Sequence, residues 1–565
     1  MSKSKFPVAI VAVIGLAIAA GVIFLGFRMT QNIGKSEKVI DQETATQTMD
    51  EMVKTIAPTE AEPVKSSIEY TGDETALSEL PDIETCKVVV NPTTPLYAEV
   101  WSSGEKTGQG TDGWLREMAE EFNASGYTVG GQPVSIKLRQ VASGQAVDYI
   151  AVGKAVPDGY TPSNMLWVKT LNARGVATDV ITEKLCGNVA GVLFDKSHNE
   201  EIMKKYGTVD LKAVTEAVAA GEVAMGYTNP FTSATGLNFL VSTLERYDSA
   251  NPLSDKAVQG FQQFQANVPF VSLTTQQMRD AAERNSLDGF ITERQVYEND
   301  SLLKGNYVFS PFGYRHDNPL VAVSGTDQSK VAILKEFSEL CLSDAAQEKA
   351  TEYGFNKQED YKEEGMANVD GSVILNALNV YKENKDSGSP IVAVFVTDVS
   401  GSMEGEPLTA LQHSLINSMK YINKRNYIGL VSYADDVTIN VPIKQFDMTQ
   451  QTYFKGGVES LRAAGATATF DGIIVAADMI QKAMQDIPNA KPMIFVLSDG
   501  ETNQGYNLND VRNVLVSLKM PVYTIGYNAN INALKEISGI NEAASIDAST
   551  ADVAYQLKTL FNANM

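Results

Sequence analysis

The sequence predicts an α/β protein that follows an N-terminal apolar helix, and three observations support this. Residues 6–27 carry no charge and are rich in Val, Ile, Ala and Leu. From Lys87 onwards, short apolar runs alternate with segments of helical periodicity, which is the pattern of layered α/β domains. Further on, two continuous apolar runs, 391–397, which is rich in β-branched residues, and 493–497, are typical of strands buried on both faces of a parallel, doubly wound sheet.

The composition excludes several classes of protein. The 565 residues contain 46 Lys and Arg against 69 Asp and Glu, which gives a net charge of −23. Because nucleic-acid binding requires clustered basic side chains that neutralise phosphates, we expect no nucleic-acid partner. Three cysteines and three histidines are too few and too widely spaced for a disulfide framework or a zinc site. A bound metal ion would therefore have oxygen ligands.

The apolar segment of residues 6–27 predicts a membrane anchor, which we assign to residues 1–28. As a helix of 22 residues it would span about 33 Å, enough to cross a bilayer. The alternative is a cleaved signal sequence with its cleavage site at Ala17–Ala19. The apolar residues that continue to Phe27 favour the anchor. We therefore expect a single-pass protein of the cell membrane, and under either interpretation the bulk of the chain lies outside the cytoplasm.

Residues 29–85 have the composition of a linker. They contain 13 acidic and 4 basic residues among Thr, Pro and Gln, and their hydrophobicity is low. Such segments repel themselves and stay extended in water. We therefore expect an acidic, solvated stalk between the anchor and the folded part.

Residues 86–355 alternate between strand-like and helix-like patterns. Strands are expected at 88–90, 98–101 and 134–138, and a helix begins near Trp114. Polar residues follow the strands at the starts of the helices, where backbone N–H groups and hydroxyls can hold a polar or anionic ligand. The alternative is that they only cap the helices. The candidates are Ser102, Ser143, Thr161, Thr228 and Asn229.

Three segments of this region, 157–167, 225–236 and 288–293, resemble the bacterial extracellular solute-binding proteins with the two-lobed, type 2 periplasmic-binding fold. The resemblance implies two α/β lobes joined by crossing strands, with the five candidate residues facing a cleft that closes around a small polar or anionic solute. The polar stretch that follows, 356–390, reads as a linker with one helix over 372–381.

The most specific pattern lies in the C-terminal region, 391–565. Asp398, Ser400 and Ser402 follow the first buried strand, and Asp499 follows the strand at 493–497. Thr467 precedes the helix between them. Because ligands in open α/β sheets bind at the carboxyl ends of strands, these side chains should meet. Two carboxylates and three hydroxyls form the all-oxygen set that Mg²⁺ prefers, and their low charge leaves the ion able to attract an acidic group.

These residues are similar to the metal-ion-dependent adhesion site (MIDAS) of the von Willebrand factor type A (vWA) domain, whose pattern is Asp-x-Ser-x-Ser with a distant Thr and a distant Asp. The resemblance implies a Rossmann-like sheet and a Mg²⁺ site, with Ca²⁺ or Mn²⁺ as alternatives. It also implies that both serines bind the ion directly, and Thr467 and Asp499 directly or through water. The one departure is Ala466, where a second Gly is common in the family.

We expect a binding protein of the cell surface and no enzyme. The metal site would bind an acidic residue of a protein partner, and the two-lobed module would bind a small ligand. His413 is the only histidine of the C-terminal region and falls inside a predicted helix, which disfavours a Ser-His catalytic site. Two alternatives stay open. One is the solute-binding component of a transport or ligand-sensing system, and the other is a hydrolase or a partner of a cytoplasmic AAA⁺ motor.

Overall fold

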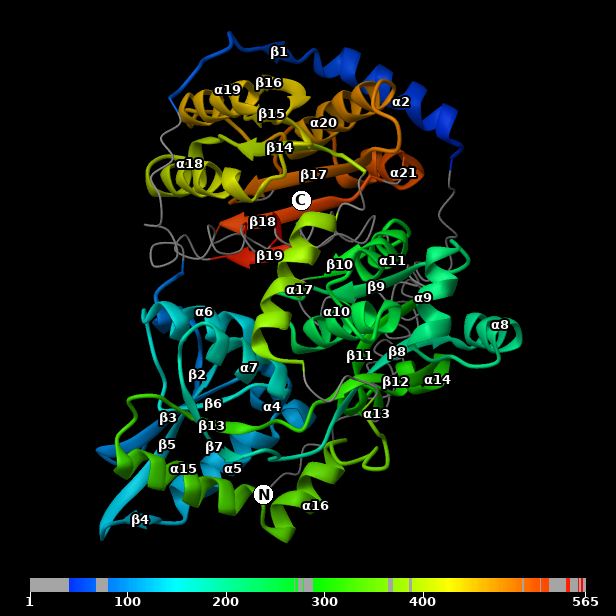
Figure 1. The fold of residues 1–565 in the computed structure, drawn as a ribbon. Helices are drawn as coiled ribbons and strands as arrows, with labels where there is room; N and C mark the ends of the chain where they lie inside the picture. The colour runs from blue at the N-terminus through cyan, green and yellow to red at the C-terminus, as the bar shows by residue number, and fades with distance from the viewer. Residues whose placement is uncertain are drawn as a thin grey trace, which may run out of the picture.

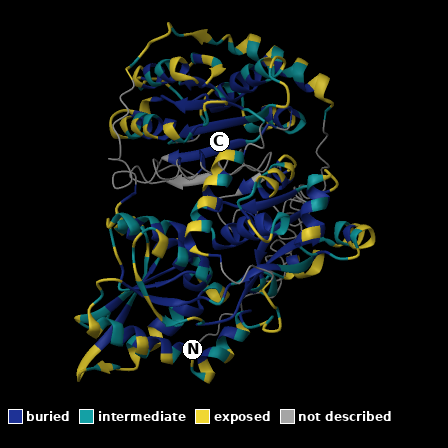
Figure 2. Cartoon of the chain, in the orientation of Figure 1, coloured by how far each residue is buried: buried dark blue, intermediate teal, exposed yellow. Residues whose placement is uncertain are grey.

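In the computed structural model the chain forms two α/β lobes and a C-terminal α/β domain (Figure 1). The structure describes residues 40–67, 80–268, 270–272, 278, 288–363, 369–385, 389–499, 502–518, 520–527, 545–548, 557, 560–561 and 565. Strands form the buried centre of each unit and helices cover them (Figure 2). The predicted α/β class is confirmed.

The first lobe contains a sheet in the order β2-β5-β3-β6-β13-β7, with β4 paired to β5. Strand β3 pairs in parallel with both β5 and β6, so the carboxyl ends of three strands meet at one edge. The strands are β2 (Val88–Val90), β3 (Leu96–Ser102), β4 (Thr128–Val129), β5 (Gln132–Gln140), β6 (Gly159–Thr161), β7 (Thr178–Thr182) and β13 (Leu320–Val323). The helices are α4 (Gly104–Thr107), α5 (Trp114–Ala124), α6 (Ser143–Val152), α7 (Met165–Ala173), α15 (Gln328–Cys341) and α16 (Asp344–Glu352).

The second lobe contains a sheet in the order β10-β9-β11-β8-β12. The chain enters it after β7 and returns to the first lobe between β12 and β13, as the expected crossing segments require. The strands are β8 (Val189–Asp195), β9 (Met225–Thr228), β10 (Phe270–Ser272), β11 (Gly289–Glu293) and β12 (Tyr307–Arg315). The helices are α8 (Lys196–Tyr206), α9 (Leu211–Ala219), α10 (Ala234–Tyr247), α11 (Asp255–Gln265), α13 (Arg294–Asn299) and α14 (Ser301–Asn306).

The C-terminal domain has a seven-stranded sheet in the order β1-β16-β15-β14-β17-β18-β19. Its pairings are parallel except that between β15 and β16, which form a hairpin. The strands are β1 (Thr59–Glu60), β14 (Ile391–Asp398), β15 (Tyr427–Tyr433), β16 (Val437–Gln445), β17 (Lys491–Ser498), β18 (Val522–Tyr527) and β19 (Ser545–Ala548). The helices are α18 (Glu406–Ser418), α19 (Met448–Glu459), α20 (Thr469–Met484) and α21 (Leu508–Leu518).

Strand β14 lies at the centre of this sheet, and all eight of its residues are buried. Successive side chains of a strand point to opposite faces. Val392, Val394 and Val396 therefore pack into one apolar cluster with α20 and α21. Ala393 and Phe395 pack into another, which continues into the two-lobed module.

The N-terminal segment corrects the predicted stalk. Residues 40–67 are folded against the C-terminal domain instead of extending from it: helix α2 (Gln42–Ile56) packs on α20 and α21. Strand β1 extends the sheet by pairing with β16 (Figure 1, blue). The reason is an apolar stripe, Ala45, Met49 and Met52, that buries its side chains despite the acidic surroundings. The C-terminal domain is thus assembled from two separated parts of the chain.

The predicted linker is also partly wrong. Within 356–390, the expected helix forms as α17 (Gly371–Asn384), but it is packed into the protein. It contacts α7 of the first lobe and α10 and α11 of the second (Figure 1). Buried Ile374, Ala377 and Tyr381 give it an apolar face that needs these partners.

The predicted membrane anchor, 6–27, lies outside the described residues, as does most of the predicted helix at 553–561. Among the helices that the structure describes, none combines the length and the hydropathy needed to span a bilayer. The anchor stays a prediction.

Replacing Met49 by Ala tests the role of α2. Met49 is 1% exposed, so we expect the C-terminal domain to lose about 2–5 kcal/mol of stability through the cavity that forms. Hydrogen exchange of the β14 and β17 amides would measure this loss. The matched control is Met448→Ala, because Met448 is 49% exposed. Equal effects of the two substitutions would contradict the assignment of α2 to this core.

Candidate functional site

Asp398 ends β14 and is fully buried, and protein groups hold both of its carboxylate oxygens. Oδ1 accepts a hydrogen bond from the backbone N–H of Ser400 at 2.8 Å. Oδ2 accepts from the hydroxyl of Ser498 at 2.6 Å and from that of Tyr433 at 3.3 Å. Burial raises the pKa of Tyr433 well above its usual value, so its hydroxyl stays protonated and donates. These three donors fix a buried carboxylate at the carboxyl edge of the sheet.

The next three predicted ligands form a continuous chain of contacts. The hydroxyls of Ser400 and Ser402 lie 3.0 Å apart, and Ser402 Oγ donates to Asp499 Oδ1 at 2.9 Å. Ser400 is buried, whereas Ser402 is exposed. The chain therefore leads from the interior beside Asp398 to the surface.

Thr467 reaches the same edge from the loop before α20. The loop is tied to the first one by two backbone hydrogen bonds, from Gly401 N–H to the Gly465 carbonyl at 3.0 Å and from Ala464 N–H to the Val399 carbonyl at 2.8 Å. Asn503 then holds Thr467 from the other side, accepting from its N–H at 2.9 Å. The structure thus brings the loops of all five predicted ligands together.

The electrostatics of the site suit a cation. Burial raises the pKa of Asp499, the hydrogen bond from Ser402 opposes this shift, and the negative charge of Asp398 adds to it. Two neighbouring carboxylates beside hydroxyl oxygens are a fitting donor set for a hard divalent cation. Among the described residues, no group of three or more His, Cys, Asp and Glu side chains is placed to hold a metal ion. A metal here would thus depend on the hydroxyls.

The first-lobe candidates for solute binding also lie together. Ser102 and Thr161 are register partners at the carboxyl ends of the parallel strands β3 and β6. Ser143 begins α6, two residues after Val141, whose N–H donates to the Ser102 carbonyl at 2.8 Å. All three residues are at least 97% buried, and within the described part of the chain none of their hydroxyls has a hydrogen-bond partner. Buried polar groups are normally paired, so these three are available to a ligand or to water.

The second-lobe candidates are engaged in their own loop. The hydroxyl of Thr228 donates to Ser233 Oγ at 2.8 Å, and Asn229 Oδ1 accepts from the N–H of Phe231 at 2.9 Å. This loop touches the start of α6, where Gly144 N–H donates to the Thr232 carbonyl at 3.2 Å. A Cβ on Gly144 would lie 2.0 Å from the carbonyl oxygen of Phe231, so only glycine permits this approach. The two lobes are therefore in contact over the predicted cleft.

Sequence reasoning missed several polar residues of this region. Lys106 is fully buried and donates to the Thr161 carbonyl at 3.1 Å and to Asn318 Oδ1 at 2.8 Å. Burial lowers its pKa. His316 lies in the crossing segment after β12 and contacts Glu293 Oε1 at 2.9 Å. The position of Lys106, shortly after the polar end of a predicted strand, could have identified it as a candidate. His316 could not be identified in this way, because its partners are distant in sequence.

Sequence reasoning also missed residues of the candidate metal site. Ser498 stands between the predicted strand and Asp499 and was not among the predicted ligands, although its hydroxyl makes the shortest bond to Asp398. Tyr433, at the end of β15, was also not among the predicted ligands. Asp398 and Tyr433 are register partners in adjacent strands, a relation that the sequence alone does not reveal.

Two protein-family models match the chain. Residues 393–563 match the von Willebrand factor type A domain, and residues 107–356 match the bacterial extracellular solute-binding protein family. The five predicted metal ligands all lie within the first match. Ser143, Thr161, Thr228 and Asn229 lie within the second, and Ser102 lies five residues before it.

Similar proteins include the inter-alpha-trypsin inhibitor heavy chain H3 of Mus musculus, 28% identical over 157 residues, or 26% of this chain. The chain spans about a fifth of the length of this relative, since the match covers 18% of it. A solved von Willebrand factor type A structure from Catenulispora acidiphila is 19% identical, with a TM-score of 0.28 and coverage of 31% of this chain and 42% of that one. A periplasmic thiamin binding protein is 11% identical, with a TM-score of 0.39 and coverage of 52% and 96%.

Replacing Thr161 by the isosteric Val tests whether its hydroxyl is unpaired. We expect the stability to stay within about 0.5 kcal/mol of wild type, because no hydrogen bond is lost. The matched control is Thr397→Val, since Thr397 is equally buried but donates to the Val431 carbonyl at 3.0 Å. That control should lose about 1 kcal/mol in calorimetric unfolding. Equal losses would show that Thr161 has a partner in solution.

Proposed function

We propose that the protein is a binding protein whose vWA site holds Mg²⁺ and thereby binds an acidic group of a protein partner. The starting point is that the chain joins a bacterial extracellular solute-binding domain to a von Willebrand factor type A domain. Asp398, Ser400, Ser402, Thr467 and Asp499 would hold the ion. The ion, when bound, would supply a positive centre with a coordination position open to a carboxylate. Ca²⁺ and Mn²⁺ are the alternative ions.

The observation that carries this proposal is the hydrogen-bonded chain from buried Asp398 to exposed Ser402. Ser498 and Tyr433 keep Asp398 oriented, and the contact between Ser402 and Asp499 puts the second carboxylate at the surface. An arrangement with buried orienting groups and an exposed end favours binding of a group from outside the domain.

The role of the protein is binding without catalysis. A serine nucleophile needs a positioned histidine, and His413, the only histidine of the C-terminal region, lies on an exposed part of α18. This argues against the hydrolase alternative.

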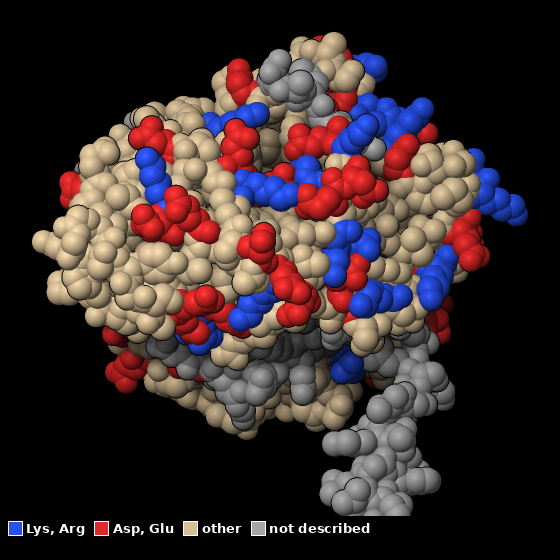
Figure 3. Space-filling model, turned by 90° about the horizontal axis from the view of Figure 1, so that it is seen from below, with Lys and Arg blue, Asp and Glu red and all other residues tan. Residues whose placement is uncertain are grey.

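On the face seen in Figure 3, acidic and basic side chains are interspersed, so no field of one sign covers that face.

The location we propose is the outer side of the cell membrane, with residues 6–27 as the anchor. Because residues 40–67 pack on the vWA domain, that domain would be the first folded unit after the membrane. The solute-binding module would then lie further from the membrane than the vWA domain, although most of the vWA domain follows it in sequence.

A second function, binding of a small polar or anionic solute, is favoured by the unpaired hydroxyls of Ser102, Ser143 and Thr161. Thr228 and Asn229 would contribute through their loop. Their buried position means that a solute must enter when the lobes separate. Such a module would serve transport or ligand sensing.

Replacing Asp398 by Ala tests the metal site. We expect calorimetric Mg²⁺ binding to the purified chain to be lost, because Asp398 is the buried carboxylate of the set. The control is Asp486→Ala, an exposed carboxylate of the same domain, which should leave binding unchanged. Undiminished Mg²⁺ binding by the Asp398 variant would exclude the site.

The partner is tested separately by capture from extracts of the source organism in Mg²⁺ or in EDTA. We expect proteins to be retained by the wild-type chain only in Mg²⁺ and not by the Asp398 variant. Retention that is equal in EDTA would refute a metal-dependent partner while leaving the metal site intact.

A further inference from the structure

Helix α17 contacts three parts of the protein at once, and in Figure 1 it stands between α7 on one side and α10 and α11 on the other, with one end at the vWA sheet. In a two-lobed binding protein, opening of the cleft moves the lobes apart. A helix packed on both lobes must then release one of them.

The N-terminal end of α17 is fitted against the first lobe. A Cβ on Gly371 would lie 2.1 Å from the carbonyl oxygen of Lys169 in α7, so the two backbones touch. The Lys169 ammonium group also donates to the Val369 carbonyl at 2.9 Å. A shallow cavity of about 520 Å³ borders this contact, lined by Asn172, Ala173 and Asp370 among others. This end is therefore held by a few close contacts.

The C-terminal half of α17 is packed on the second lobe. The buried Tyr381 ring lies 5.9 Å from the ring of Phe231 and 6.2 Å from that of Phe261. Gln262 of α11 donates to Asn384 Oδ1 at 2.6 Å. Phe231 belongs to the loop over the cleft, and its carbonyl oxygen faces Gly144 of the first lobe. The helix thus packs against the loop through which the second lobe meets α6 of the first lobe.

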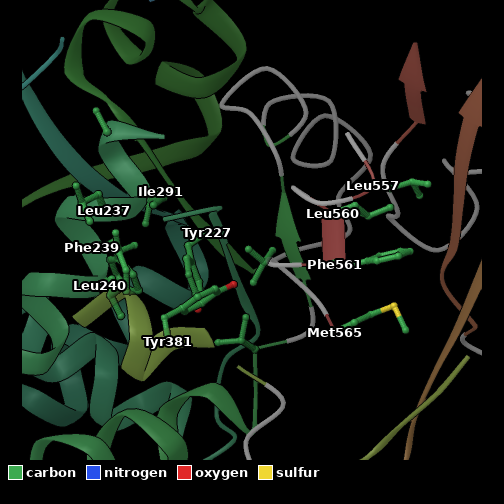
Figure 4. Packing of buried hydrophobic residues seen from close by; sticks show 14 of the residues in the cluster. Tyr227, Leu237, Phe239, Leu240, Ile291, Tyr381, Leu557, Leu560, Phe561 and Met565 are labelled. Carbon is green, nitrogen blue, oxygen red and sulfur yellow. The ribbon is translucent and has the colours of Figure 1, made fainter. Parts of the chain in front are cut away.

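The last turn of α17 is joined to the vWA domain. The buried ammonium group of Lys385 donates to the Phe561 carbonyl, and Arg425 donates to the Glu383 carbonyl at 3.4 Å. Phe561 packs edge-on against Phe395 of β14 and Phe495 of β17, with ring centroids 5.4 and 5.5 Å apart. Figure 4 shows Tyr381 and Phe561 in one apolar cluster.

We propose that α17 is a strap that holds the lobes closed and couples their opening to the packing of the vWA domain. The strands that end in Asp398 and Ser498 carry the rings against which Phe561 packs. Separation of the lobes would disrupt the packing of α17 at Gly371 or at Tyr381. The displaced helix would then disturb the contact of Lys385 with the vWA domain. The strap needs neither a solute nor a metal ion, so it stands apart from the proposed function.

Gly371→Ala in the full chain tests the lobe contact, with hydrogen exchange measured by mass spectrometry. We expect roughly tenfold faster exchange in residues 229–233 and at the start of α6, because the added methyl group displaces α17 from α7. The control is Gly305→Ala, since a Cβ there meets no atom within 4 Å. Faster exchange confined to α7 and α17, no change, or the same change in the control would each overturn the strap.

Lys385→Met tests the coupling to the vWA domain. The variant keeps the apolar stem and removes the donor to the Phe561 carbonyl. We expect faster exchange in β14 and β17, whose rings pack against Phe561, and also in residues 229–233 of the second lobe. Faster exchange in the vWA domain alone would refute the coupling, whatever the outcome for Mg²⁺ or solute binding.

Discussion

The burial of β14 on both faces is the constraint on which the other parts of the structure depend. One face belongs to the apolar cluster that β14 shares with α20 and α21, on which the N-terminal helix α2 packs, and the other belongs to the apolar cluster that includes Tyr381 and Phe561. Because parallel neighbours bond to both of its edges, its carboxyl end is fixed. Asp398 is placed there, so the geometry of the candidate metal site follows from the packing of distant segments.

Local patterns predicted two central strands of this sheet, β14 and β17, and the candidate ligands that follow them. The continuous β-branched run made β14 recognisable, and the polar residues after β14 and β17 located the candidate ligands. The orienting groups were harder to find, since Tyr433 reaches Asp398 only through strand pairing and Ser498 only through the neighbouring strand. Residue pairs that meet only through tertiary structure have no characteristic spacing by which the sequence could reveal them.

The errors came from averaging composition over long segments. Residues 29–85 are acidic on average, yet Ala45, Met49 and Met52 recur at helical spacing within them and are buried. Asp41, which caps α2 by accepting from Thr44 N–H, was a second local signal. Likewise, the polar ends of the segment 356–390 concealed a helix with an apolar face. In both cases a short amphipathic helix is buried although the residues around it are polar. Its apolar face packs against a partner elsewhere in the chain.

These features describe a protein in which two binding modules share one continuous apolar core. The most direct test of the candidate metal site is anomalous diffraction from crystals of the full chain soaked in Mn²⁺. This ion substitutes for Mg²⁺ and can be located by its anomalous signal. We expect one peak bonded to the hydroxyls of Ser400 and Ser402, beside Asp398. A fully soaked crystal with no peak there, or with its only peak elsewhere in the vWA domain, would contradict the metal site.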